Sequence, residues 1–455
     1  MFEAIRPLDK NVLPESEQLD IIIIGAGLGG LGAAIALRLA GHKVTVLEAA
    51  SALGEVGAGI QILPNSSRVL IQWGLQDYME ARATYPTKVN ILGWKGNAIT
   101  SMDFGEATRE YGAPFWDFHR ADLHLGLLAR SKELGAMILV NSRVAHIDCS
   151  SAEKARVILE NGQNLESDMV IGADGLHSRC REILLGKPSP PKATGDLAYR
   201  VLLEADAFRD DPELAVFLHP HEVRYWLGPD AHAVNYPLRR GKLLNMVLCV
   251  PDDMPADATT LDGNVKEMQA AFKDWDPRIP KVLKYCLSVQ KWKLCYHPSF
   301  EASWSNSTGT LVLLGDAVHA MLPYLASGAG MSLEDAATLG VCLSKVSKQS
   351  SNAERVHALT VYENCRRPRT EAVVERGNLQ QTLYHFPNGT QQAERDALFK
   401  KYEERSHKDD TDEKDPLAWR RHGVGSWLLS YNVSKDIANN WHKQHKAGRD
   451  SVLQP

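Results

Sequence analysis

The stretch IIIIGAGLGG, residues 21–30, places a run of β-branched residues directly before glycines in the spacing G-x-G-x-x-G. A short apolar run that ends at a glycine is typical of a central parallel strand buried on both faces. Residues 31–40 follow with a helical pattern that ends at Gly41, and residues 43–48 predict a second strand. This succession of strand, helix and strand is the unit that binds dinucleotides in α/β proteins.

The glycines of this turn have separate physical tasks. Gly25 allows the tight turn, Gly27 lets the backbone approach a pyrophosphate, and Gly30 permits close packing of helix on strand. The helix N-terminus adds unpaired N–H groups and the positive end of its dipole. Glu48 lies about 20 residues further on, where a carboxylate accepts both ribose hydroxyls. Because a carboxylate disfavours a phosphorylated ribose, the unit is predicted to bind FAD or NAD rather than NADP.

Two more glycine-marked motifs lie far along the chain. IGADG occupies residues 171–175, and LGDAVH at 314–319 follows an apolar strand pattern that begins at residue 309. A further glycine-rich stretch, EVGAGIQILPNS, covers residues 55–66. A single G-x-G-x-x-G is a weak signal, because glycine turns are common. Three motifs in this order indicate one pocket for a single large nucleotide.

These motifs resemble those of the FAD-dependent aromatic hydroxylases, in particular the salicylate-hydroxylase-like flavin monooxygenases common in fungi. The resemblance extends from about residue 19 to about residue 431. It implies an α/β fold with a Rossmann-like FAD-binding domain, an inserted, mostly antiparallel β-sheet substrate domain and a helical C-terminal part. The expected ranges are 19–186 and 306–376 for the FAD-binding domain, 187–305 for the substrate domain, and 377–455 for the helical region with a flexible tail.

The resemblance also assigns contacts to the cofactor. Gly59 would approach the flavin ring, Arg120 the phosphate and ribose, and Asp316 a ribityl hydroxyl. The segment 328–331 would lead N–H groups at the N-terminus of a helix expected from Leu333 to about Ser344 toward the N1–C2=O edge of the ring. Asp174 is expected to cap and orient its loop, with a second role in binding left open. The family usually has glutamine where this chain has Ser327, so the substrate side of that loop is expected to differ. The complete predicted cofactor set is Gly25, Gly27, Gly30, Glu48, Gly59, Arg120, Asp174, Asp316, Gly328, Ala329 and Gly330.

Residues 187–305 change to short alternating stretches, which predict an antiparallel sheet. By resemblance, Arg200, Tyr236 and His232 occupy positions that contact substrate in relatives, and Arg200 would hold a phenolate. A cation or base that favours ionisation and orients the ring would accelerate hydroxylation. Tyr236 and His232 also have structural alternatives. Tyr236 could pack in the core, and His232 could be an ordinary hydrogen-bonded histidine.

The activity that the resemblance implies is an O2-dependent monooxygenation with NADH or NADPH as reductant. A flavin C4a-hydroperoxide would transfer one oxygen atom to a phenol, an aromatic acid or a fungal natural-product intermediate. Indole epoxidation and Baeyer–Villiger oxidation use the same chemistry and stay open, as does a flavin-binding redox scaffold without turnover. A second G-x-G-x-x-G and a C-x-x-x-x-C pair are both absent, which argues against the disulfide reductases.

Composition bounds the remaining possibilities. The 455 residues, 44% of them hydrophobic, suffice for two or three domains. The net charge of −5 shows no excess of basic residues of the kind that binds nucleic acid. Seven scattered cysteines predict reduced thiols in a cytoplasmic setting. The apolar window 21–40 favours a buried Rossmann unit over a membrane span. We therefore expect a monomer or homodimer that binds a small aromatic molecule, without a metal, a membrane or nucleic acid.

The C-terminal part begins with a helical pattern over residues 358–375 that contains Arg366, Arg367 and Arg369. These arginines predict either a solvated face or a structural network of salt bridges. Pro368 lies among them and is expected to kink the helix or split it in two.

Overall fold

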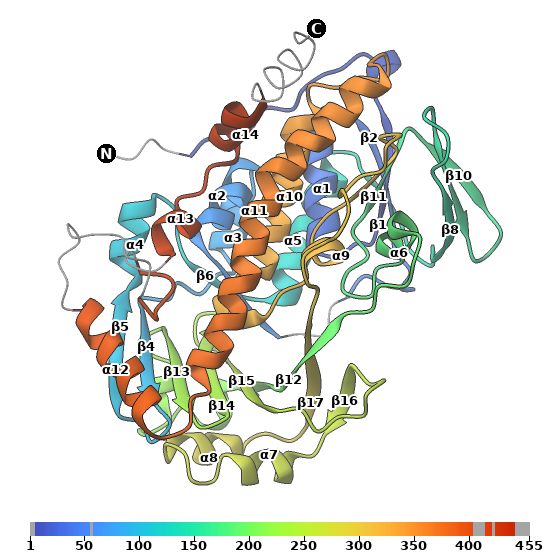
Figure 1. Ribbon diagram of the computed structural model, residues 1–455. Coiled ribbons are helices and arrows are strands. Elements are labelled where there is room, and N and C mark those ends of the chain that lie inside the picture. Colours follow the sequence, from blue (N-terminus) through green and yellow to red (C-terminus); the bar gives the residue numbers. More distant parts are fainter. Residues whose placement is uncertain (1–4, 55–57, 404–414, 421–423, 442–455) are drawn as a thin grey trace, which may run out of the picture.

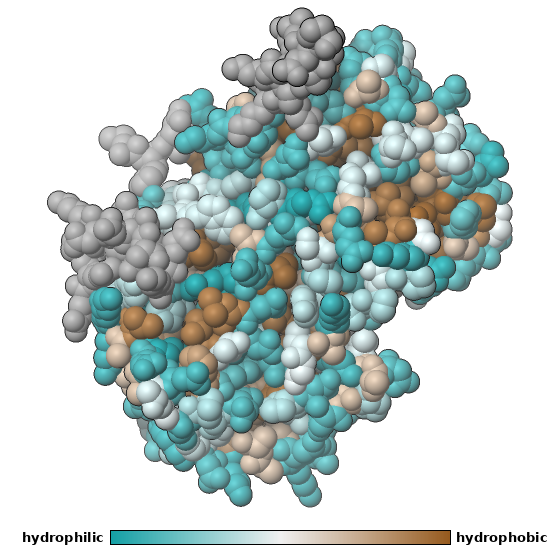
Figure 2. Space-filling model, in the orientation of Figure 1, coloured by the Kyte–Doolittle hydropathy of each residue, from teal (hydrophilic) through white to brown (hydrophobic). Residues whose placement is uncertain are grey.

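The computed structural model describes residues 5–54, 58–403, 415–420 and 424–441. Figure 1 shows a parallel sheet in one half of the molecule, a second sheet in the other, and the long helix α11 (Asn352–Tyr384) running across both. On the face seen in Figure 2, hydrophilic side chains cover most of the surface and apolar ones gather in separate patches. The predicted α/β fold class is confirmed; the flexible tail expected at the C-terminal end of the helical region lies outside the described residues.

The parallel sheet has the strand order β18-β11-β1-β2-β7. The isoleucine run lies in β1, the middle strand of this sheet. All four isoleucines are buried, as a strand covered on both faces requires. The apolar window 21–40 therefore forms a strand and helix α1 (Leu28–Leu39), which begins earlier than predicted because its first turn includes the glycines. No helix of the described residues is long and apolar enough to cross a membrane. The strands of this sheet are β1 (Asp20–Ile24), β2 (Lys43–Leu47), β7 (Met137–Leu139), β11 (Met169–Gly172) and β18 (Leu311–Leu313).

The carboxyl ends of these strands bring the separate motifs together. Gly25 follows β1, Glu48 follows β2, Asp174 comes just after β11, and Gly315 comes just after β18. Because the carboxyl ends of parallel strands meet at one edge of a sheet, all these motifs lie along the same edge, where ligands of open α/β sheets bind.

The second sheet has eight strands in the order β16-β17-β12-β15-β14-β13-β4-β5. Its neighbours are antiparallel except for β13 and β4, so the prediction of a mostly antiparallel sheet is confirmed. Strands β4 and β5 come from the part of the chain before residue 186, so the first part of the chain contributes a hairpin to this sheet. The strands are β4 (Lys88–Gly93), β5 (Ala98–Asp103), β12 (Lys192–Glu204), β13 (Glu222–Gly228), β14 (Ala231–Leu238), β15 (Leu243–Pro251), β16 (Thr260–Gly263) and β17 (Val289–Tyr296).

The two faces of this second sheet have different tasks. Helices α7 (Val265–Ala271) and α8 (Arg278–Leu283) lie beneath it in Figure 1 and close an apolar core with one face. The other face packs toward the segment around residues 322–331 and the end of α11. The second face is therefore the one that meets the cofactor half of the molecule.

Shorter elements connect and cover these sheets. Strands β8–β10 form a small antiparallel sheet, and β3 pairs with β6. The remaining bounds are β3 (Gly59–Ile62), β6 (Trp116–His119), β8 (Val144–Asp148), β9 (Ala155–Leu159), β10 (Asn164–Ser167), α2 (Pro64–Gln72), α3 (Gln76–Glu80), α4 (Phe104–Tyr111), α5 (Arg120–Glu133), α6 (Arg179–Leu185), α9 (Asp316–His319), α10 (Gly328–Leu343), α12 (Thr390–Glu403), α13 (Gly425–Leu429) and α14 (Val433–Trp441).

A buried ion network joins α10 to α11. The Arg366 guanidinium donates to Asp335 at 2.8 Å and to Glu334 at 2.6 Å, and Arg369 donates to both carboxylate oxygens of Glu334 at 2.7 and 2.9 Å. Arg366, Glu334 and Asp335 are fully buried, and Arg369 is 4% exposed. Of the two predictions for the arginine cluster, the structural network of salt bridges is therefore the correct one for this pair.

The expected split of the helix at Pro368 is wrong. Helix α11 is 33 residues long and continues through the proline without a break. Proline removes one backbone hydrogen bond, but the arginines on either side of it, Arg366 and Arg369, are both anchored to α10. These anchors hold the helix in place across the missing bond.

The charge state of the network follows from its partners. Burial opposes the ionisation of Asp335, but His319 and Arg366 outweigh it and lower its pKa to about 2. Burial likewise opposes ionisation of Glu334, and the two arginines lower its pKa. Both carboxylates are thus ionised and balance the two guanidinium groups.

We predict that Glu334→Gln lowers the free energy of unfolding by about 3 kcal/mol or more, because it leaves two buried arginines short of one negative charge. Urea unfolding of the purified protein measures the effect. The matched control is Glu375→Gln on the exposed side of α11, which should unfold like the wild type. Equal stability of the two variants would contradict the role given to the network.

Candidate functional site

Two adjoining cavities run along the carboxyl edge of the parallel sheet. One has a volume of about 320 Å³ and is lined by Glu48 and Asp174; the other, of about 340 Å³, reaches the second sheet at His232 and Tyr236. Their walls have three residues in common, which are Gly27, Ala173 and Gly175. The site is therefore an elongated trough that leads from the end of β2 to the substrate half of the molecule.

The glycines at the middle of the trough leave its floor open. A Cβ on Gly27 would meet no protein atom within 4 Å, so the backbone there is bare toward the cavity. A Cβ on Gly30 would lie 2.0 Å from the carbonyl oxygen of Gly25, which only a glycine avoids. The two glycines thus have the predicted geometry: one exposes backbone to a ligand and the other lets helix and turn touch.

Glu48 lies beside this turn and binds its backbone. Its carboxylate accepts the Ala26 N–H at 2.9 Å and the Ala50 N–H at 2.8 Å through different oxygens. Each carboxylate oxygen can accept a second hydrogen bond. Glu48 is thus held at the cavity wall with capacity left for ribose hydroxyls.

Asp174 holds the loop after β11, as expected. It accepts hydrogen bonds from the Ser178 hydroxyl and from the backbone N–H groups of Arg179 and Cys180 at 2.8 and 3.0 Å. These bonds cap α6 and fix Gly175 in the wall that both cavities share.

Helix α10 presents its N-terminus to the cavity. It begins at Gly328, five residues before the predicted start at Leu333, and Ser327, Gly328 and Ala329 all line the cavity. Ser327 is buried, and its hydroxyl donates to the Leu325 carbonyl at 2.9 Å. The free N–H groups and dipole of this helix favour negative charge on a ligand.

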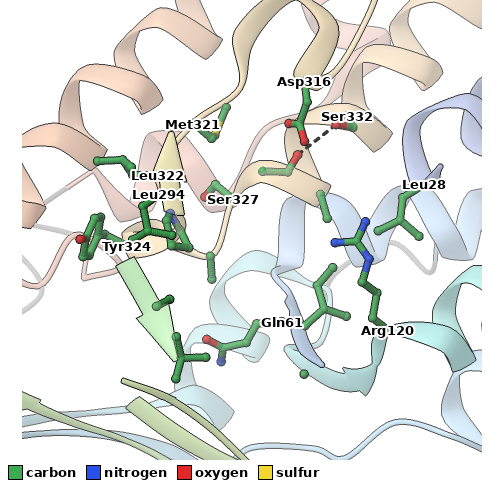
Figure 3. Close-up of a pocket in the computed structure, with 18 of the residues that line it drawn as sticks. Leu28, Gln61, Arg120, Leu294, Asp316, Met321, Leu322, Tyr324, Ser327 and Ser332 are labelled. Atoms are coloured by element: carbon green, nitrogen blue, oxygen red, sulfur yellow. Dashed lines mark hydrogen bonds between the residues drawn. The ribbon is translucent and has the colours of Figure 1, made fainter. Parts of the chain in front are cut away.

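Figure 3 shows the side chains that project into this cavity from several elements. Arg120 at the start of α5 and Asp316 at the start of α9 point toward the space between them. Leu294, Leu322 and Tyr324 stand together at the other end. Polar side chains thus line the cavity where the cofactor motifs meet, and a group of mostly apolar side chains lies at its other end.

The three predicted substrate residues come from one face of the second sheet and line the same cavity. Arg200 on β12 is level with Val234 on β14, because both pair with Val247 on the strand between them. His232 is two residues further along. Standard sheet spacings separate the backbones of Arg200 and His232 by roughly 10 Å across the strands and roughly 7 Å along them. Arg200 and His232 therefore lie on the same face of the sheet, two strands apart.

Tyr236 packs against the cofactor half. A Cβ on Gly59 would lie 2.7 Å from the Tyr236 ring and 2.5 Å from Asn245, and Asn245 accepts the Gly59 N–H at 2.7 Å. Burial raises the pKa of the Tyr236 phenol well above its ordinary value. Tyr236 is therefore a neutral hydroxyl beside the strand that was predicted to approach the flavin. The preceding residues of that motif, 55–57, lie outside the described part of the chain.

Arg200 stands in a wall between two cavities. Besides the cavity described above, it lines a second one of about 590 Å³ together with Arg120 and Trp292. Its guanidinium lies 4.8 Å from the centre of the Trp292 ring, and its buried Nε has no hydrogen-bond partner among the described residues. Burial lowers its pKa, yet a guanidinium stays charged in proteins. No described carboxylate forms a salt bridge with Arg200.

His232 has a partner that the sequence did not indicate. Its Nδ1 lies 2.7 Å from Nε2 of His385, the residue that ends α11. Asp196 on β12 and Tyr324 complete the same cluster. His232 and His385 lie 153 positions apart, and Tyr324 and Asp196 lie 128 apart, so only the tertiary fold brings the cluster together and no local motif could have identified it.

The trough fits FAD by its own chemistry. The bare backbone at Gly27 and the guanidinium at Arg120 suit a pyrophosphate, and the carboxylate at Glu48 suits ribose hydroxyls. The N-terminus of α10 suits a ring that becomes negatively charged on reduction.

The comparisons agree with this geometry. A family model described as an FAD binding domain matches residues 18–377. The FAD-dependent monooxygenase OpS4 of Beauveria bassiana is 37% identical over 92% of this chain and 96% of its own length. The 3-hydroxybenzoate 6-hydroxylase of Klebsiella oxytoca is 32% identical over 83% and 92%. A salicylate hydroxylase solved as a substrate complex has the same fold, with a TM-score of 0.72 at 22% identity over 93% of this chain and 98% of that one.

Fold and site thus define a flavoprotein with an FAD-binding domain that extends over most of the chain. The chain belongs to the FAD-dependent monooxygenases. The resemblance inferred from the glycine motifs is confirmed.

We predict that Gly27→Val abolishes FAD retention without unfolding the protein. The new side chain would enter open cavity rather than protein, and its extended backbone is allowed for valine. Flavin absorbance per protein after gel filtration should fall, with a Kd for FAD raised at least about tenfold, which corresponds to ~1.4 kcal/mol. Far-ultraviolet circular dichroism should match that of wild-type protein stripped of FAD. A yellow variant with full flavin content would contradict the assignment of this turn.

Proposed function

We propose that the protein hydroxylates an electron-rich aromatic compound that carries an acidic group, with NADH or NADPH as reductant and O2 as oxidant. The observation that carries this proposal is the partly buried guanidinium of Arg200, which lines the cavity with a buried, unpartnered Nε and without a carboxylate partner among the described residues. A partly desolvated cation of this kind is stabilised by an anion. Relatives named as hydroxybenzoate and salicylate hydroxylases support a substrate of that type.

The residues of the chain would perform four tasks in this reaction. Arg200 would bind a phenolate or carboxylate, and Tyr236 and His232 would orient the ring by hydrogen bonds. Leu294, Leu322 and other apolar side chains would exclude water. The N-terminus of α10 would stabilise negative charge on the cofactor ring. Bound FAD supplies the redox chemistry and the activation of O2.

The setting of the reaction is part of the proposal. All seven cysteines are free thiols, which supports a reducing, cytoplasmic location. We further propose that the active unit is a monomer or homodimer. Gel filtration with light scattering measures this state.

The proposal is tested by screening phenols, hydroxybenzoates and indoles for substrate-stimulated oxidation of NADH and NADPH, with mass spectrometry of the products. A product that gains one oxygen atom on a phenolic ring supports it. Stimulation only by indoles, or a product with oxygen inserted into a carbon–carbon bond, would favour epoxidation or Baeyer–Villiger oxidation instead. Flavin reduction that no aromatic compound stimulates would favour a redox scaffold.

We predict that Arg200→Gln lowers turnover of the best substrate about 30- to 150-fold, the loss of one charge-assisted hydrogen bond. FAD content and the flavin spectrum should stay unchanged. Arg209→Gln, at an exposed arginine beyond β12, is the matched control and should keep full turnover. Near-normal turnover in Arg200→Gln would mean that the substrate carries no anion at this position.

A further inference from the structure

A chain of three side chains, with His232 and Asp196 buried and His385 partly buried between them, leads away from the cavity wall. His232 on β14 lines the cavity, and its Nδ1 lies 2.7 Å from Nε2 of His385. The other ring nitrogen of His385, Nδ1, lies 3.4 Å from Asp196 Oδ2. Asp196 comes from β12, His232 from β14 on the other side of β15, and His385 is the C-cap residue of α11, so the three form one row that leads from the cavity wall.

Asp196 is held firmly at the far end of this row. Its Oδ2 accepts the Tyr324 hydroxyl at 2.7 Å and the Gln381 side-chain amide at 2.6 Å, and the residue is 7% exposed. Two donors of this kind stabilise an ionised carboxylate. A fixed negative charge therefore faces Nδ1 of His385.

This charge determines where the protons of the two neutral rings lie. The carboxylate favours a proton on Nδ1 of His385, which leaves Nε2 of His385 as an acceptor. Nε2 of His385 therefore accepts a hydrogen bond from the Nδ1–H of His232. The remaining nitrogen of His232, Nε2, is then a bare lone pair for a ligand in the cavity.

Both rings are neutral in these surroundings. Burial lowers the pKa of His232 well below its ordinary value, and His385 lowers it further. Burial also lowers the pKa of His385, against the opposing effect of Asp196 and of the exposed Asp230. The other groups packed around His232 are the phenols of Tyr225, Tyr324 and Tyr384, which are uncharged because burial raises the pKa of each.

We propose that Asp196 and His385 are positioning residues that hold His232 in its Nδ1–H tautomer, so that its Nε2 accepts the hydroxyl proton of an un-ionised phenol. The inference rests on the proposed function and narrows its substrate class. Arg200 would bind the acidic group of the ring, and His232 would accept a hydrogen bond from a free hydroxyl. Hydroxybenzoates carry both groups. A methyl ether at the hydroxyl position has no proton to donate and would lose this bond.

The binding test compares 3-hydroxybenzoate with 3-methoxybenzoate, titrated into the full-length FAD-loaded protein by flavin absorbance. In Asp196→Asn the neutral amide no longer selects the His385 tautomer, so 3-hydroxybenzoate should bind about 3- to 10-fold more weakly, the loss of one neutral hydrogen bond. The affinity for 3-methoxybenzoate should not change. Asp230→Asn removes an equal charge near His385 from an exposed turn, and should leave both affinities as in the wild type.

A second measurement does not depend on turnover or on the ligand. Nitrogen NMR of protein labelled in its histidines, assigned with His232→Gln, should show His232 as the neutral Nδ1–H tautomer in the wild type and in Asp230→Asn. Asp196→Asn and His385→Leu should each change this signal, and His385→Leu serves where Asp196→Asn does not fold. An unchanged tautomer in both variants, or an equal loss of affinity for both benzoates, overturns the proposal. A wild type that hydroxylates no phenol yet shows this tautomer pattern would refute the proposed function alone.

Discussion

The buried ion network between α10 and α11 is the constraint on which the cofactor site depends. Uncompensated charges in an apolar interior cost several kcal/mol each, so these side chains are stable only as a set. Asp335 also accepts the Gly315 N–H at 2.9 Å and binds His319, while Glu334 accepts the Asn65 amide at 2.6 Å. One cluster of charges therefore fixes the N-terminal half of α10, the loop that carries Asp316, and the start of α2.

Helix α11 extends this constraint to the substrate end. Its middle carries the arginines of the network, and its last turn carries Gln381 and ends at His385, both in contact with Asp196. A rigid helix of this length joins the two sites directly (Figure 1). The register that places Arg366 between Glu334 and Asp335 thus also places His385 behind His232.

Much of the cofactor half could be predicted from the sequence, because its signals are local. A glycine run after an apolar strand and Glu48 at the end of the next strand depend on spacing alone, and the structure brings these residues to one sheet edge. The start of α10 was missed, since glycines in its first turn weaken the helical pattern. The continuity of α11 through Pro368 and the His385–Asp196 pair depend on contacts between distant segments, which no window of sequence contains.

The substrate wall shows why residue identity alone left His232 ambiguous. A histidine in a cavity is an acceptor, a donor or a cation according to its other nitrogen, and here that nitrogen belongs to His385. Ser327 adds to the same argument: its hydroxyl turns back to the Leu325 carbonyl, so the position where relatives have glutamine offers little to a substrate. Under the proposed function, orientation of the substrate ring then depends on the second sheet, from which Arg200 and His232 line the same cavity.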